Sequence, residues 1–100
     1  MSARLLQINY ELTGPKVAYE QENLPYAQPI ADLPGLRWKI WIIDEARKEA
    51  GGIYLFDSDA AVQAFLDGPI VAEMKGDPTL SIKSFEVITH LTSITRGPLI

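Results

Sequence analysis

The segment from residues 34 to 56 places apolar side chains on both faces of two successive extended runs. In the first run, strict alternation sorts the apolar residues into two faces: Leu36, Trp38, Ile40 and Ile42 on one, Trp41 and Ile43 on the other. In the second run the faces are Gly52, Tyr54 and Phe56 against Ile53 and Leu55. The charged stretch from Asp44 to Glu49 predicts the turn between them. A hairpin that is apolar on both faces must be covered on both faces.

Strand and helix patterns flank this hairpin. Residues Arg4 to Thr13 alternate as a first strand, and Gly14-Pro15 ends it. Val17 to Ala31 is rich in helix formers, but Pro25 and Pro29 interrupt the hydrogen-bond ladder, so we expect a short or broken helix there.

The second half of the chain continues with a capped helix. Asp57, Ser58 and Asp59 supply an N-cap and favourable negative charge, and apolar residues then recur at helical spacing through Leu66. A short helical piece is expected from Ile70 to Met74. Thr79 to Leu91 is β-branched and predicts the last strand, and the tail beyond it could reach a partner subunit.

The element order is strand, helix, strand, strand, helix, strand. This is the α+β, ferredoxin-like βαββαβ arrangement with an antiparallel four-stranded sheet, formed by a single domain over residues 1–100. Two helices cover only one face of such a sheet. We therefore expect two copies to meet through their bare faces as an obligate homodimer, a dimeric α+β barrel.

Composition excludes several classes of function. The net charge is −4 without a basic cluster, which argues against a nucleic-acid partner, and no apolar run approaches a membrane span of ~20 residues. No hydrophobic signal core follows the N-terminus, so we expect a cytoplasmic protein. With no cysteine and one histidine, neither thiolate chemistry nor a usual metal-ligand set is available.

The runs PGLRWKIW and EAGGIYLF and the helix AAVQAFL resemble the YdhR-type monooxygenases, a group within the dimeric α+β barrel superfamily. The resemblance covers most of the chain and departs from it around the two helix prolines and after Gly68. Relatives in the antibiotic-biosynthesis monooxygenase group oxidise polycyclic aromatic substrates with molecular oxygen and without metal or flavin. The resemblance therefore implies a cofactor-independent monooxygenase acting on a small, hydrophobic, aromatic compound.

Such an enzyme needs a dry pocket and groups that favour a substrate anion. His90 is a candidate base, and Tyr54 could direct its hydroxyl at a ligand, although it could equally be a core tyrosine. One of the two tryptophans, Trp38 and Trp41, should face the helices and line the pocket, and Trp38 is our choice from its strand parity.

Other polar residues are candidate ligand contacts. Asn9 could hold a ligand carbonyl or oxygen, and Tyr19 and Tyr26 could close the pocket from the first helix. Arg37 and Lys39 could attract an anionic substrate, although charged strand residues more often lie at a sheet rim with solvated heads.

Three rival functions stay open at this stage. Some relatives with this barrel bind and degrade haem through Asn, Trp and His, and Asn9, a tryptophan and His90 are present here, but no local spacing brings them together. Haem therefore ranks below the cofactor-free interpretation. The others are a non-oxidative isomerase or decarboxylase of aromatic compounds, and a stress-response module that only binds a small ligand.

Overall fold

The computed structural model describes residues 2–99 and contains a four-stranded antiparallel sheet in the order β2-β3-β1-β4. Its strands are β1 (Arg4–Glu11), β2 (Leu36–Asp44), β3 (Glu49–Phe56) and β4 (Ser81–Glu86). Its helices are α1 (Lys16–Ala31), α2 (Asp59–Leu66), α3 (Pro69–Met74) and α4 (Thr89–Ile94). The predicted ferredoxin-like βαββαβ order is confirmed, with α3 and α4 added to it.

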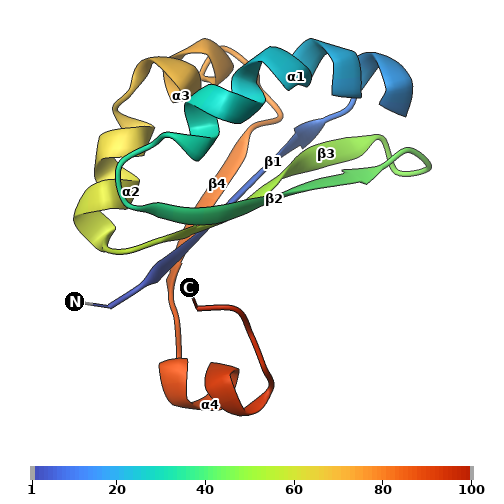
Figure 1. Ribbon diagram of the computed structural model, residues 1–100. Coiled ribbons are helices and arrows are strands. Elements are labelled where there is room, and N and C mark those ends of the chain that lie inside the picture. Colours follow the sequence, from blue (N-terminus) through green and yellow to red (C-terminus); the bar gives the residue numbers. More distant parts are fainter. Residues whose placement is uncertain (1, 100) are drawn as a thin grey trace.

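The molecule has two main layers, the sheet and the helices α1, α2 and α3 that cover one of its faces (Figure 1). The short helix α4 lies on the other side of the sheet. Side chains from β1, β3, α2 and α3 form most of the core between the layers, and Ile30 is the one core residue from α1: Leu6, Ile8, Ile30, Tyr54, Phe56, Val62, Phe65 and Val71. Ser58 caps α2 by accepting a 3.2 Å hydrogen bond from the amide of Ala61, as predicted.

The strand register decides which residues meet the helices. Leu6 pairs with Tyr54 and Ile8 with Gly52, so the even positions of β1 and β3 face α1–α3. In the hairpin, Lys39 pairs with Tyr54 and Trp41 with Gly52, so odd positions of β2 share that helix face.

A register irregularity between Leu36 and Trp38 changes the parity at the start of β2. Leu36 pairs with Phe56 and packs against the core, whereas Trp38 pairs with Leu55 on the opposite face. The prediction that Leu36 and Trp38 share a face is wrong, because the extra residue of a bulge reverses alternation.

The first helix is continuous over 16 residues, so the prediction of a short or broken helix is wrong. Pro25 and Pro29 both lie inside α1 and both are exposed. Carbonyl groups that lose an amide partner at these positions can be solvated, which lowers the cost of the interruption. The charged turn, the capped second helix and the short helix before Gly76 are confirmed.

The last strand is shorter than the predicted Thr79–Leu91 segment. It ends at Glu86, which pairs with Arg4, the first residue of β1. Beyond Arg4 the neighbouring strand offers no further ladder partner, so the chain leaves the sheet and forms α4. The segment then returns beneath β2, where the Trp38 Nε1 donates a 3.0 Å hydrogen bond to the carbonyl of Pro98.

The sheet face opposite α1–α3, called here the open face, and the α4 segment beside it carry large exposed apolar side chains. Ile40 and Phe85 on the strands are 51% and 45% exposed, and Ile88, Leu91 and Ile94 on the α4 segment are 58–64% exposed. Across residues 2–99, no helix is both long and apolar enough to cross a membrane.

Candidate functional site

The space between α1 and the sheet is the candidate site. Three adjoining cavities of about 300, 350 and 150 Å³ lie there, and Asn23 of α1 borders all three. The first lies against Trp41 and Tyr19, and the second opens between Tyr10 and Tyr19. The third reaches Lys39 and Trp41 on β2, an edge strand of the sheet.

The composition of α1 explains why this space is not filled. Of its 16 residues only Ile30, near the C-terminal end, is buried, and the helix has no continuous apolar stripe. The half of α1 that contains Tyr19 and Asn23 therefore stands over the sheet without a packed apolar interface. The candidate site therefore lies beside the core, beneath the part of α1 that contributes no buried residue.

Lys39 lies on the helix face in the third cavity. Its Nζ is 3.2 Å from the centroid of the Trp41 ring and 4.6 Å from that of the Tyr54 ring. Burial lowers the pKa of the Lys39 amine from 10.5 to about 7. Among residues 2–99 it takes part in no ion pair, so nothing holds it permanently in the charged form.

Three tyrosines, Tyr10, Tyr19 and Tyr54, lie on the helix side of the sheet, and Tyr10 and Tyr54 are near Lys39. The hydroxyl groups of Tyr10 and Tyr19 hydrogen-bond each other, and their ring centroids are 6.3 Å apart. Burial raises the pKa of Tyr10, Tyr19 and Tyr54 above the ordinary value. All three phenols are therefore neutral at physiological pH and can act as hydrogen-bond donors.

The predicted site residues divide between the two sides of the sheet. Trp41 and Tyr26 line the cavities, and the Tyr26 hydroxyl donates a 2.9 Å hydrogen bond to Glu73 of α3. Tyr54 faces the helices but is only 1% exposed, with its ring 5.1 Å from that of Phe65. The face of its ring lies beneath the Lys39 amine, and the rest of the side chain packs as a core residue.

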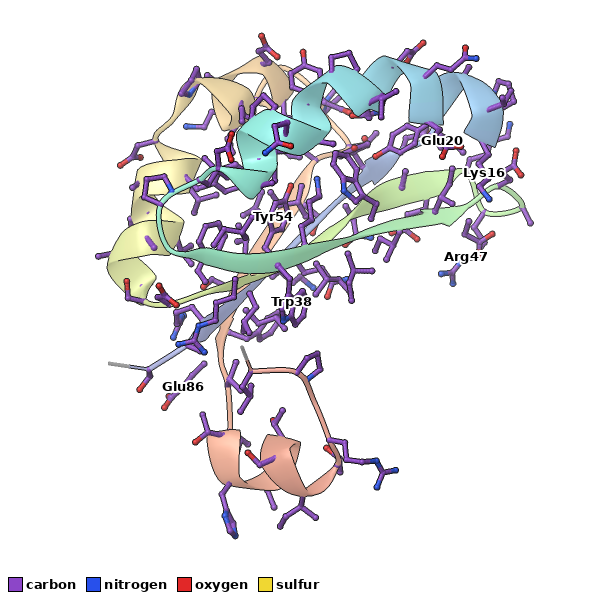
Figure 2. The ribbon with its side chains drawn as sticks, in the orientation of Figure 1. Lys16, Glu20, Trp38, Arg47, Tyr54 and Glu86 are labelled. Atoms are coloured by element: carbon purple, nitrogen blue, oxygen red, sulfur yellow. The ribbon has the colours of Figure 1, made fainter. Side chains whose placement is uncertain are left out.

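Trp38 does not line this space, so choosing Trp38 over Trp41 for the helix side was wrong. Figure 2 shows Tyr54 above the sheet, toward the helices, and Trp38 below it. Trp38 does share a face with Ile40 and Ile42, the parity on which the choice depended, but that face is the open face and not the helix side.

Asn9 and His90 are also not brought together with the cavities. Asn9 lies on the open face, where it accepts from Gln7 at 2.9 Å and donates to Glu49 at 3.2 Å. His90 is an exposed residue of α4, on the other side of the sheet from α1. Neither side chain borders the cavities.

Sequence reasoning missed the role of Lys39 and of Asn23, and set Tyr19 aside. Lys39 does lie on an edge strand, β2, but the register places its side chain on the helix face opposite Tyr54, where it is half-buried and not solvated as expected. The signal was available: the turn fixes the pairing of Asp44 with Glu49, and counting back from there puts Lys39 beside Tyr54 and Gly52.

Comparison with known proteins gives the family. The family model described as "Putative mono-oxygenase ydhR" matches residues 5–98. The chain belongs to the YdhR family. No curated protein sequence matches it.

Solved structures show the same fold as this YdhR family member. NE2512 of Nitrosomonas europaea, a protein of unknown function, is 21% identical with a TM-score of 0.67, covering 88% of this chain and 91% of that one. The haem-degrading protein Rv3592 of Mycobacterium tuberculosis is 22% identical with a TM-score of 0.64, covering 88% and 94%. SnoaB of Streptomyces nogalater, a cofactor-independent oxygenase, is 13% identical with a TM-score of 0.68, covering 87% and 94%.

The residues of the cavities do not match the haem set expected from the sequence. Of Asn9, a tryptophan and His90, only Trp41 borders the space between α1 and the sheet. Among residues 2–99, no cluster of three or more metal-ligating side chains is found. The innermost cavity brings together the Trp41 ring, the Lys39 amine, the phenols of Tyr10 and Tyr26, and the carboxylate of Glu73, and further charged side chains line the two outer cavities.

Proposed function

We propose that this YdhR family member is a cofactor-independent monooxygenase that oxidises a small aromatic compound between α1 and the sheet. The observation that carries the proposal is the aromatic and apolar cavity around Trp41, which adjoins a half-buried amine and a pair of hydrogen-bonded phenols. An electron-rich substrate anion can transfer an electron to oxygen without a metal, provided that the protein excludes water and stabilises the anion.

The size of the site limits the substrate. Ligand cavities commonly measure ~300–1,000 Å³. The apolar cavity beside Trp41 has about 300 Å³, and the cavity at Lys39 adds about 150 Å³. This supports a substrate of one or two rings rather than a long polycyclic compound. The remaining cavity, of about 350 Å³, is lined by Glu11, Glu22 and Asp77 and is less suited to an aromatic ring. The overall reaction at an activated methylene carbon would consume one O₂ and yield a carbonyl group and one water.

Oxygen uptake tests the proposal. The purified protein is assayed with a panel of naphthols, naphthalenediols, quinols and anthrones, with and without a metal chelator. Uptake that requires the protein and survives chelation is expected. No uptake and no product across the panel would contradict an oxygenase and favour a non-oxidative enzyme or a binding protein.

A pair of matched variants locates the activity. Ala27 borders the cavity beside Trp41, whereas Ala64 is exposed on α2 and borders none of the three. Ala27→Leu should fill the cavity and thereby reduce kcat/KM at least tenfold. Alanine and leucine are both good helix formers, so the substitution should leave α1 intact. Ala64→Leu should leave the activity unchanged. Equal effects of the two changes would place the reaction elsewhere.

We also propose that the protein works as a homodimer through the open face and α4. Support comes from the exposed Ile40 and Phe85 on the strands and from Leu91 among the unpartnered apolar residues of α4. A stable dimer of this kind buries more than ~2,000 Å² in total. Sedimentation analysis at micromolar concentration should show a dimer, and a stable monomer would refute the proposal.

A further inference from the structure

The most unusual group in the candidate site is the amine of Lys39. It lies between the rings of Trp41 and Tyr54, with its Nζ 3.2 and 4.6 Å from their centroids. A lysine ammonium is strongly hydrated and is rarely buried without a carboxylate partner. Here the aromatic rings replace only part of the lost hydration, so the amine remains open to a further partner.

The sheet is shaped to hold this amine in place. Gly52 lies opposite Trp41 on β3, and a Cβ at Gly52 would meet Lys39 Cε at 2.5 Å and Tyr54 Cε1 at 3.2 Å. Because Gly52 has no side chain, the Lys39 chain has room to lie over this part of β3. This accounts for the second glycine of the Gly-Gly pair, which the fold alone does not require.

We propose that the ε-amine of Lys39 accepts the proton of an acidic hydroxyl group on the substrate and then holds the resulting anion beside Trp41. This inference rests on the proposed function and deepens it. The substrate O–H bond breaks and an N–H bond forms, so a neutral amine and a neutral phenol or enol become an ammonium and a phenolate or enolate. No electron leaves the pair in this step. The substrate class is therefore one- or two-ring phenols and enols.

The surroundings favour this transfer. An amine with a pKa of about 7 is roughly half neutral at physiological pH, so it can accept a proton, and its charged form is then stabilised by the new anion. The ion pair would form in a place lined by aromatic rings, where charge attraction is much stronger than in water.

The titratable groups that face Lys39 do not compete for this role. Tyr10 on β1, Tyr54 on β3 and Tyr26 on α1 are phenols whose pKa is raised, so they are neutral. Glu73 of α3 borders the same cavity, but its carboxylate accepts the Tyr26 hydroxyl and forms no ion pair with Lys39 within residues 2–99.

The test uses 4-nitrophenol, whose anion is yellow and whose neutral form is nearly colourless, and 4-nitroanisole, which has no acidic proton. Binding is measured by equilibrium dialysis and by anion absorbance in a buffer slightly below the pKa of free 4-nitrophenol. The wild type should raise the anion fraction and bind 4-nitrophenol at least tenfold more tightly than Lys39→Met. Binding of 4-nitroanisole should differ less than twofold.

Two further variants sharpen the test. Gly52→Ala keeps the charge but displaces the Lys39 side chain, and should also lower the anion fraction. Lys75→Met removes an exposed lysine after α3 and should have no effect. Equal 4-nitrophenol binding by the wild type and Lys39→Met, or no binding by the wild type, would overturn the inference.

Oxygen uptake separates this inference from the proposed function. If Lys39→Met loses the anion preference but no phenol or enol leads to oxygen uptake by the wild type, the role of Lys39 stands and the oxygenase proposal fails. If Lys39→Met consumes oxygen with an unchanged kcat/KM and pH profile, the oxygenase proposal stands and the role of Lys39 fails.

Discussion

Replacing Lys39 with methionine should stabilise the fold at neutral and acidic pH. Methionine is unbranched and flexible, so it can follow the path of the lysine chain over the Trp41 ring without displacing its neighbours. The substitution removes an amine whose charged form is poorly solvated. A residue retained despite a cost in stability is characteristic of a functional site.

The magnitude follows from the pKa. Lowering the pKa of the Lys39 amine from 10.5 to about 7 corresponds to about 5 kcal/mol of penalty on the charged form. Attraction between the ammonium and the Trp41 ring, and the solvent contact that Nζ retains, reduce the net effect on the free energy of unfolding to about 2–3 kcal/mol. For a domain of 100 residues this is a rise in Tm of roughly 10 °C.

The sign of the pH dependence is fixed by linkage. Below pH 7 both the folded and the unfolded chain carry the proton, so the folded wild type bears the whole penalty. Between about pH 7 and 10.5 only the unfolded chain binds the proton, so wild-type stability rises with pH. The advantage of Lys39→Met should therefore be largest near pH 6 and should decline steadily as the pH rises from about 7 towards 10.5.

Urea unfolding at a fixed protein concentration measures this difference. Both proteins are compared at about pH 6 and about pH 9.5, below the range in which the buried tyrosines ionise. Lys75→Met is the control, and its effect should be the same at both pH values. A Lys39→Met protein that is less stable than the wild type at the lower pH, or whose gain does not depend on pH, would refute the account of Lys39 as a desolvated amine.

Other predictions test the sheet, the tyrosine pair and the open face. Gly51→Ala should lower the free energy of unfolding in urea by about 3 kcal/mol or more, because its Cβ would overlap the backbone carbonyl of Ile8 on β1. Gly52→Ala should lower it by about 1 kcal/mol, because only the flexible Lys39 side chain must move. Equal losses for the two variants would contradict this. Tyr19→Phe removes the hydrogen bond to Tyr10 and should lower thermal stability by about 1 kcal/mol, and an unchanged Tm would show that the pair contributes nothing. Leu91→Asp should weaken dimerisation at least tenfold in sedimentation analysis without changing the far-UV circular dichroism, and an unchanged dimer would exclude α4 from the interface.

Much of the fold follows from alternation and turn chemistry. The capped start of α2 at Ser58, the charged turn of the hairpin and the order of strands and helices along the chain follow from local signals, and the structure has each of them. Which face of the hairpin meets the helices is not local, because both faces are apolar. The choice between Trp38 and Trp41 needed the register of β2 on β3, which pairs Trp41 with Gly52 on the helix face, because alternation alone does not say which apolar face meets the helices.

The candidate site was less predictable for a related reason. Asn9 and His90 were selected by residue type, yet Asn9 shares its face with Gln7 rather than with the core, and His90 follows a strand that ends early. Lys39 was undervalued because a charged residue in a strand suggests a solvated rim. Its environment depends on Gly52 of the neighbouring strand, and that pairing is visible only once the register is known.

The core and the cavities are built from different elements, and this bears on how such a protein can evolve. The buried residues of the core come from β1, β3, α2 and α3, with Ile30 as the single one from α1. None of them comes from β2. The cavities are bordered mainly by the exposed-to-half-buried side chains of α1 and β2. Substitutions that reshape the site therefore cost little folding free energy. A lineage built on this scaffold can exchange substrates by small steps without first acquiring compensating mutations in its core.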